Sequence, residues 1–298
     1  MNIVALLNSI PGAIGQGLIW GVMAIGVYVS YKILDYADLT VDGSFCTGGA
    51  VCAVLIVAGV NPAVALLASI VAGMIAGLFT GLIHTVFGIP AILSGILMQL
   101  ALYSINLRIM GKANVTVSRT QYDLLLSSRD NVSAIFVAGL VVAAVVGILY
   151  WFFGTELGCA IRATGNNERM SRAQGINTNM MKVIGLVLSN GIVGLAGGVL
   201  TQYQGNADIN MGRGAIVIGL AAVVIGGIFN SKSSNFAVRL STTAAGGIVY
   251  YLVIAFVLWL GLDTQDLKLF SALIVFIFLA IPYVKKNYLA KSHLKGGK

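Results

Sequence analysis

Over its 298 residues the chain is 58% hydrophobic and only 9% charged, which excludes an ordinary soluble domain, because such domains carry roughly 25% charged residues. The net charge of +8 comes from positive residues dispersed along the chain, with five lysines in the final segment 285–298, so nucleic-acid binding is not expected. The apolar runs are long and continuous, which predicts membrane-spanning helices and not alternating barrel strands. The expected fold is an all-α, polytopic membrane helix bundle.

Nine apolar stretches predict membrane spans, with eight or ten as the bounds. Turn-forming residues at Asn61, Pro62, Gly88 and Pro90 separate neighbouring stretches. The whole chain, residues 1–298, is therefore expected to form a single transmembrane domain. The predicted spans are 14–33, 44–60, 62–83, 90–108, 132–153, 183–203, 214–229, 237–260 and 267–284.

Basic residues predict the orientation of these spans, because lysine and arginine are enriched in cytoplasmic loops. With the C-terminus in the cytoplasm, the basic tail 285–298 and the polar segment 154–181 lie inside and the N-terminus lies outside. Roughly twice as many positive residues then fall inside as outside, as that enrichment requires. The inside set, apart from the tail, is Lys32, Arg162, Arg169, Arg172, Lys182 and Lys232.

The first predicted span is followed by the sequence DLTVDGSF, in which Asp38, Thr40 and Asp42 precede a helix expected to begin near Gly43. Asp42 can cap that helix, with help from Thr40. A helix that begins inside the membrane would also direct its positive N-terminal dipole toward an anionic group in transit. The pattern leaves both capping and a translocation path open for these three residues.

The third predicted span carries a stripe of glycines. Gly73, Gly77 and Gly81 are spaced by four residues and share one face of the helix. Small residues at this spacing let the backbones of membrane helices approach each other closely. We therefore expect this face to pack against another helix.

Polar residues within the apolar spans are candidates for a translocation path. Gln99, Ser104 and Asn106 lie within or near the end of the fourth span, and Asn190 lies in the sixth. Polar groups at membrane depth usually face the protein interior or a water-filled path. Path lining and simple hydrogen bonding between helices are both compatible with this pattern.

The most polar stretch of the chain, IRATGNNERMSRAQGINTN at 161–179, lies between two long apolar runs. Asn166 or Asn167 can cap a helix there, with Glu168 in its first turn and Gly175 ending it in a left-handed conformation. A helix of about two turns is not stable alone in water, so it needs a surface to lie against. A solvated cytoplasmic loop is the simpler alternative. The cations available to such a surface are Arg162, Arg169 and Arg172.

This stretch and the span after it resemble permeases of the branched-chain amino acid and ribose ABC importer family. Two further segments resemble the sugar permeases of that family: DLTV at 38–41 and AAVVIGG at 221–227. Asp42 and the missing glycine directly after Val41 depart from the sugar pattern, which leaves the substrate open. The matching residues of the first segment are Gly165, Asn167, Arg172, Gly175, Ile176, Asn177, Gly194, Leu195, Ala196 and Gly197.

The resemblance implies a permease subunit in the bacterial cell membrane whose loop 154–181 carries a coupling helix that docks on a separate ATPase. The chain has no G-x-x-x-x-G-K-[ST] motif, so ATP and Mg²⁺ would be bound by the ATPase and this chain would carry no cofactor. The other expected partners are an extracytoplasmic substrate-binding protein, a second permease copy or paralogue, and membrane lipid. The expected coupling residues are Gly165, Asn167, Glu168, Arg169, Arg172 and Gly175.

The segments DLTVDGSF and LYSINLRIMGKAN look like those of permeases found beside binding proteins for aromatic amino acids such as tryptophan or tyrosine. Amino acids, sugars and nucleosides all remain open as substrates. A secondary transporter or channel without an ATPase is the alternative function. An enzyme is not expected, because the two histidines and the dispersed carboxylates form no catalytic arrangement, and the three cysteines have no metal-ligand spacing.

Overall fold

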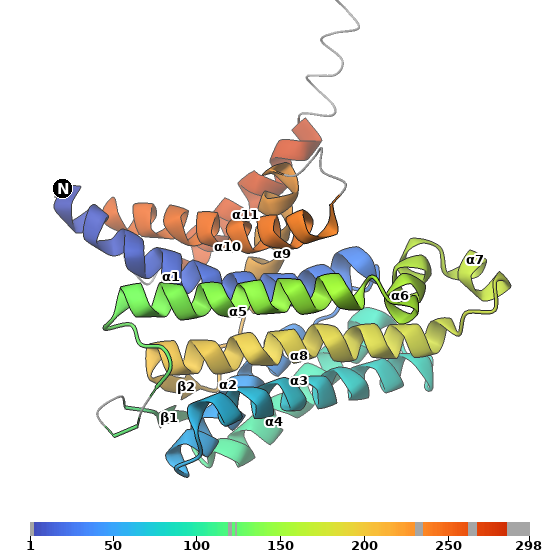
Figure 1. Ribbon diagram of the computed structural model, residues 1–298, viewed down its shortest axis with the longest axis horizontal. Helices are drawn as coiled ribbons and strands as arrows, with labels where there is room; N and C mark the ends of the chain where they lie inside the picture. Colours follow the sequence, from blue (N-terminus) through green and yellow to red (C-terminus); the bar gives the residue numbers. More distant parts are fainter. Residues whose placement is uncertain (1–2, 119–120, 123, 230–234, 262–266, 285–298) are drawn as a thin grey trace, which may run out of the picture.

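The computed structural model describes residues 3–118, 121–122, 124–229, 235–261 and 267–284, and the predicted basic tail 285–298 lies outside them. Helices dominate the described chain (Figure 1). Their bounds are α1 Ile3–Tyr28, the π-helical η1 Val29–Ile33, α2 Val41–Val57, α3 Pro62–Thr85, α4 Ala91–Met110, α5 Asn131–Phe152, α6 Glu156–Asn166, α7 Glu168–Ala173, α8 Thr178–Gln204, α9 Ala215–Phe229, α10 Phe236–Trp259 and α11 Leu267–Val284.

Each of the nine predicted stretches coincides with a helix, but the count of nine full spans is not confirmed. Among the described residues, six helices are long and apolar enough to cross a membrane. The helices α2 and α9, and the described apolar part of α11, are shorter. A non-helical segment precedes each of α2 and α9, at residues 34–40 and 205–214, and takes part of the length that a continuous span would use. The molecule is a polytopic helical membrane protein with two interrupted helices.

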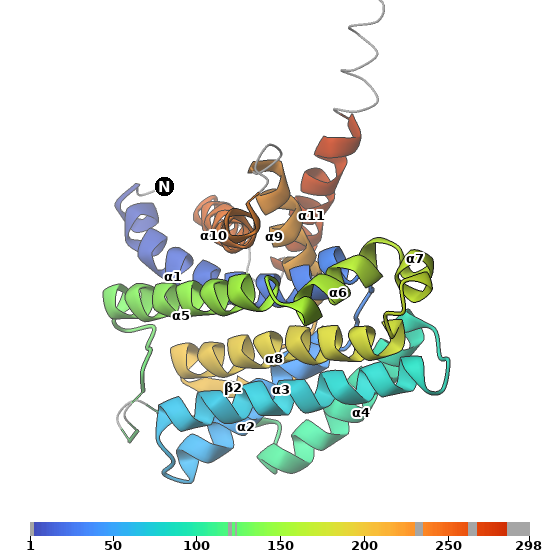
Figure 2. The same cartoon turned by 45° about the vertical axis from the view of Figure 1, so that its right-hand side comes forward.

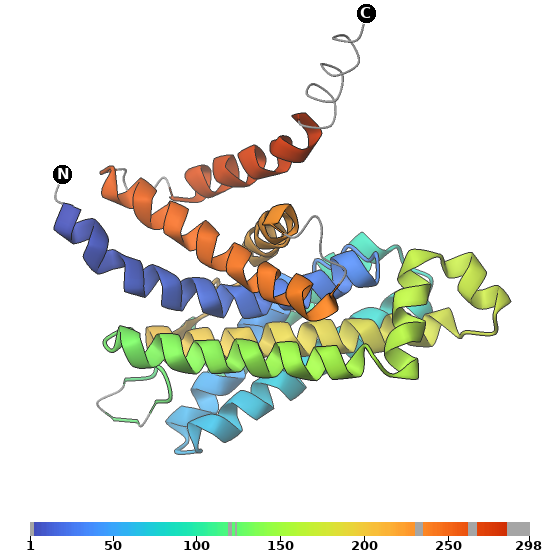
Figure 3. The ribbon, with the colours of Figure 1, turned by 45° about the horizontal axis from the view of Figure 1, so that its top comes forward.

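Two groups of helices, α1–α4 and α8–α11, follow the same order along the chain. In each group a long first helix is followed by a non-helical segment and then by a short helix. Helix α3, the third of the first group, packs along α8, the first helix of the second group. Likewise α10, the third helix of the second group, packs along α1. The helices α1 and α8 run in opposite directions (Figures 1 and 3). This arrangement is typical of inverted repeats in transporters.

The glycine stripe of α3 faces α8. A Cβ atom at Gly73 would overlap the carbonyl oxygen of Asn190, and one at Gly77 would overlap that of Leu186. At Gly81 it would approach the Cα of Val183 to 3.0 Å. The absence of side chains on this face therefore allows the two backbones to touch, as small residues do in membrane bundles.

Two short strands, which the sequence did not predict, pair at one end of the otherwise helical bundle. The strands β1, Asn114–Thr116, and β2, Asn206–Asp208, are antiparallel, with Val115 opposite Ala207. The helices α6 and α7 project from the opposite end (Figure 2). The two ends of the molecule thus carry different polar structures.

Candidate functional site

Helix α7 has the capping residues that its sequence predicts. The side chain of Asn167 accepts a hydrogen bond from the Met170 N–H at 3.0 Å, and Gly175 follows the helix with φ +83°. Helix α6, which precedes it, was not predicted as a separate element. Its signal was present in the sequence, because Thr155 caps it by accepting from the Gly158 N–H and Glu156 occupies its first turn.

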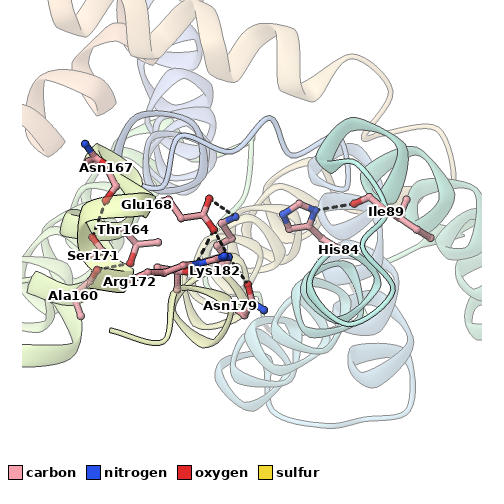
Figure 4. A network of polar contacts seen from close by, with 11 residues as sticks. His84, Ile89, Ala160, Thr164, Asn167, Glu168, Ser171, Arg172, Asn179 and Lys182 are labelled. Carbon is pink, nitrogen blue, oxygen red and sulfur yellow. Dashed lines mark hydrogen bonds and ion pairs between the residues drawn. The ribbon is translucent and has the colours of Figure 1, made fainter. Parts of the chain in front are cut away.

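Glu168 ties α7 to the start of α8 (Figure 4). Its carboxylate accepts hydrogen bonds from Lys182 Nζ at 2.8 Å and from Arg172 Nη2 at 2.7 Å, and Thr178 Oγ1 lies 3.3 Å away. The hydrogen bond from Lys182 is the largest cause that lowers the pKa of the Glu168 carboxyl below its ordinary value. This ionic network holds the short helix in place, which its own length could not do.

The predicted coupling residues divide into two groups in the structure. Asn167, Glu168, Arg172 and Gly175 build the α7 turn itself, and Arg169 is exposed on the same helix. Gly165 instead lies half-buried in α6, where a Cβ atom would overlap the carbonyl oxygen of Ile33.

Exposed side chains on the projecting loop include Arg169 and two methionines that sequence reasoning missed. Met170 is 59% exposed and Met180 is 54% exposed. Arg162 on α6 is also exposed, and its guanidinium lies over the Phe236 ring at 5.5 Å. The segment from α7 to the first turn of α8 therefore exposes a cation and flexible apolar side chains.

A buried polar cluster surrounds the start of α2. Asp38 is 2% exposed, and its carboxylate accepts from the Thr40 N–H at 2.9 Å and from Asn190 Nδ2 at 2.7 Å. Ser44 donates to Asn190 Oδ1 at 2.6 Å, and Thr40 and Thr80 share a hydrogen bond of 2.8 Å. Asp38 thus bonds to both Thr40 and Asn190, and through Ser44 and Thr80 the cluster connects α2, α3 and α8, which favours a structural role within the bundle.

The prediction that Asp42 caps its own helix is wrong. The N-cap residue of α2, Thr40, makes no side-chain capping bond. Asp42 instead accepts from the backbone N–H groups of Gly214 and Ile216, both at 2.9 Å, and so caps the beginning of α9. The physical reason is tertiary, because the folded chain brings the first turns of both interrupted helices together and the free N–H groups of α9 need an acceptor.

A pocket of about 420 Å³ lies beside this junction, between the beginning of α2, helix α4 and the turn before α9. It unites three of the predicted path residues, Asp42, Gln99 and Asn106, whereas Ser104 is exposed outside its lining. Sequence reasoning missed two further lining residues, Tyr103 and Arg213. The Arg213 guanidinium carbon lies 5.8 Å from the centre of the Tyr103 ring.

The remaining reactive side chains have structural partners. His84 Nδ1 lies 2.8 Å from the Ile89 carbonyl oxygen (Figure 4). Of the three cysteines, Cys46 and Cys52 are buried and Cys159 is exposed. Within the described segments, no group of three or more His, Cys, Asp or Glu is placed to hold a metal ion. A helical membrane bundle in which two interrupted helices meet beside a pocket is typical of transport proteins.

The chain belongs to the family of the branched-chain amino acid transport system permease component, whose family model matches residues 9–282. It is 38% identical to the tyrosine transport system permease protein of Clostridioides difficile (strain R20291), over 92% of this chain and 91% of that relative. It is 25% identical to the ribose import permease protein RbsC of Escherichia coli (strain K12), over 74% of this chain and 70% of that protein.

The fold is also that of a solved structure. PsaBC from Streptococcus pneumoniae, in complex with Fab, matches with a TM-score of 0.57 and 14% sequence identity, over 93% of this chain and 95% of that chain. At this identity the likeness concerns the fold alone. The family places the chain among transport permease subunits and not among enzymes.

Proposed function

We propose that this chain is the membrane subunit of an ATP-binding cassette importer that moves an amino acid with an aromatic side chain into a bacterial cell. Separate ATPase subunits supply the energy and bind ATP and Mg²⁺. An extracytoplasmic binding protein delivers the substrate at the end that carries β1 and β2, and a second permease copy or paralogue completes the channel. The chain crosses the inner membrane with its C-terminus in the cytoplasm.

The observation that carries the ATPase coupling is the projecting helix α7. Glu168 fixes it through Lys182 and Arg172 to the beginning of α8, and α8 packs along α2, α3 and α1 in the middle of the bundle. A force applied to α7 is therefore transmitted to the helices that surround the pocket. The exposed Arg169 and Met170 supply a charge-assisted and an adaptable apolar contact for the groove of a partner.

The amino acid substrate is supported by the 38% identical tyrosine transport system permease protein. A pocket that contains Tyr103 and Arg213 offers an aromatic ring and a cation within one site.

The test is uptake of radiolabelled tyrosine into proteoliposomes that contain the permease together with its copurifying ATPase and binding protein. We expect accumulation that requires ATP on the ATPase side and the binding protein on the other. Ribose and a nucleoside serve as competitor substrates. Uptake that proceeds at the same rate without ATP would instead favour the secondary transporter or channel.

A further inference from the structure

The pocket between α2, α4 and the turn before α9 contains a buried polar atom that has no partner among the described residues. Asn106 is 1% exposed, and its Oδ1 atom accepts no hydrogen bond there. The same side chain lines the pocket. A buried acceptor without a donor costs stability, so such a group calls for an explanation such as a ligand or a bound water. The amide of Asn106 therefore holds an unused acceptor beside the pocket.

The charges of the pocket form a pair of opposite sign. Arg213 is exposed, and its guanidinium lies over the Tyr103 ring. The next residue in the chain, Gly214, donates its backbone N–H to the Asp42 carboxylate. The Asp42 carboxylate compensates the positive end of α9. Each carboxylate oxygen keeps a further lone pair beyond its backbone hydrogen bond.

The walls of the pocket are partly apolar. Ile96, Leu100 and Tyr103 project from α4, and Leu100 is 65% exposed. The volume of about 420 Å³ falls in the range of sites that hold a small molecule. The pocket thus presents a cation, an anion, neutral amide groups and an apolar wall together.

We propose that this pocket is the transit site for a zwitterionic α-amino acid with an aromatic side chain, which rests on the proposed function. Arg213 receives the substrate carboxylate through its guanidinium, which fits a planar carboxylate. The substrate ammonium donates to Asn106 Oδ1 and to the oxygens of Gln99 and Asp42. The aromatic side chain lies against Tyr103 and Leu100, where ring contacts are favourable.

A direct test uses protection of a cysteine from a maleimide. Leu100→Cys in a Cys159→Ser background adds an accessible thiol to the pocket. The Cys159→Ser protein alone is the control for Cys46, which also lines the pocket but is buried, as is Cys52. In the full complex, tyrosine should slow labelling, whereas tyramine and 3-(4-hydroxyphenyl)propionate should not. The former lacks the carboxylate and the latter lacks the ammonium. Equal effects of all three compounds, or no protection by tyrosine, would overturn the zwitterion site.

A second test measures tyrosine moved per ATP hydrolysed by the reconstituted complex. We expect Arg213→Gln and Asn106→Leu each to lower this ratio by about tenfold or more, the effect of losing one hydrogen bond to a charged group. Arg108→Gln is the matched control, since this exposed arginine on α4 lies outside the pocket lining. An unchanged ratio in both pocket variants, with normal membrane insertion, contradicts the site.

The two proposals fail in different ways. If the wild-type complex accumulates no amino acid with ATP, the proposed function is wrong. If it accumulates tyrosine but shows neither protection nor an effect of Arg213→Gln, the function stands and the pocket assignment is wrong.

Discussion

Asn190 on α8 donates a hydrogen bond of 2.7 Å to the carboxylate of Asp38, which lies 152 residues earlier in the chain. Both side chains are buried, and Asn190 also accepts from Ser44 at 2.6 Å. One amide thus joins the non-helical segment before α2 to the first turn of that helix and to α8. The interruption of the first helix group is held in place by this contact.

Asn190→Leu should therefore destabilise the permease strongly. The substitution leaves the Asp38 carboxylate and the Ser44 hydroxyl without their partner, and an unsatisfied buried polar group costs about 1–3 kcal/mol, more when it is charged. Thermal unfolding of the detergent-solubilised protein measures the effect. Asn8→Leu, at an exposed position on α1, is the matched control and should shift the midpoint little. Equal shifts for the two variants would contradict a structural role of the cluster.

Gly77→Ala should weaken the contact between α3 and α8. The added Cβ meets the Leu186 carbonyl oxygen, and the helices must separate at a cost of about 1–3 kcal/mol. Gly139→Ala on α5 is the control, because no atom lies within 4 Å of a Cβ placed there. That variant should be neutral or slightly stabilising, since alanine favours helix. The comparison is made by thermal unfolding, and a Gly77 variant as stable as its control would refute the close contact.

Asp42→Ala should loosen the beginning of α9, although the substituted residue lies in α2. The variant removes the acceptor for the Gly214 and Ile216 N–H groups, and loss of a helix cap costs about 0.5–2 kcal/mol. Asp42→Asn, which keeps one acceptor oxygen, should lose less. Hydrogen exchange reads out the location, with faster exchange expected at 215–219 and little change at 43–47. Faster exchange confined to α2 would restore the capping role predicted from sequence.

The α7 network should depend on pH through Glu168. Because its pKa is lowered in the folded protein, the stabilisation is fully present above the ordinary value of 4.5 and is lost as the pH falls through the lowered pKa. Protection of residues 168–182 from hydrogen exchange, corrected for the intrinsic pH dependence, should be constant from about pH 8 to 6 and decline only below about pH 4. Glu168→Gln should abolish the decline. A decline of equal size in that variant would exclude Glu168 as its source.

Cys159 on α6 offers a test of the orientation. It is the exposed one of the three cysteines, while Cys46 and Cys52 are buried. A membrane-impermeant maleimide should label Cys159 in inverted membrane vesicles and not in intact spheroplasts. Cys159→Ser should remove the labelling. Labelling from the outer face would place α6 and α7 on the side of the substrate-binding protein and would end the ATPase-docking proposal.

The sequence predicted the class of fold, the position of each apolar helix and the caps of α7, because these features depend on local composition and spacing. Continuous apolar runs can satisfy their backbone groups in lipid only as helices, and Asn167 and Gly175 act within their own turn. The stripe of Gly73, Gly77 and Gly81 likewise indicated a contact face. It did not indicate that the partner is α8.

What only the tertiary structure decided is which of the polar residues belong together. Asp38 and Asn190 meet inside the bundle, whereas Asp42 caps α9 and lines a pocket to which Arg213 also contributes. Residues separated by more than a hundred positions become neighbours through helix packing, and no local pattern records that pairing. The sequence by itself therefore determined a membrane bundle with a capped polar loop, and the packing of its two helix groups determined which distant residues line one pocket.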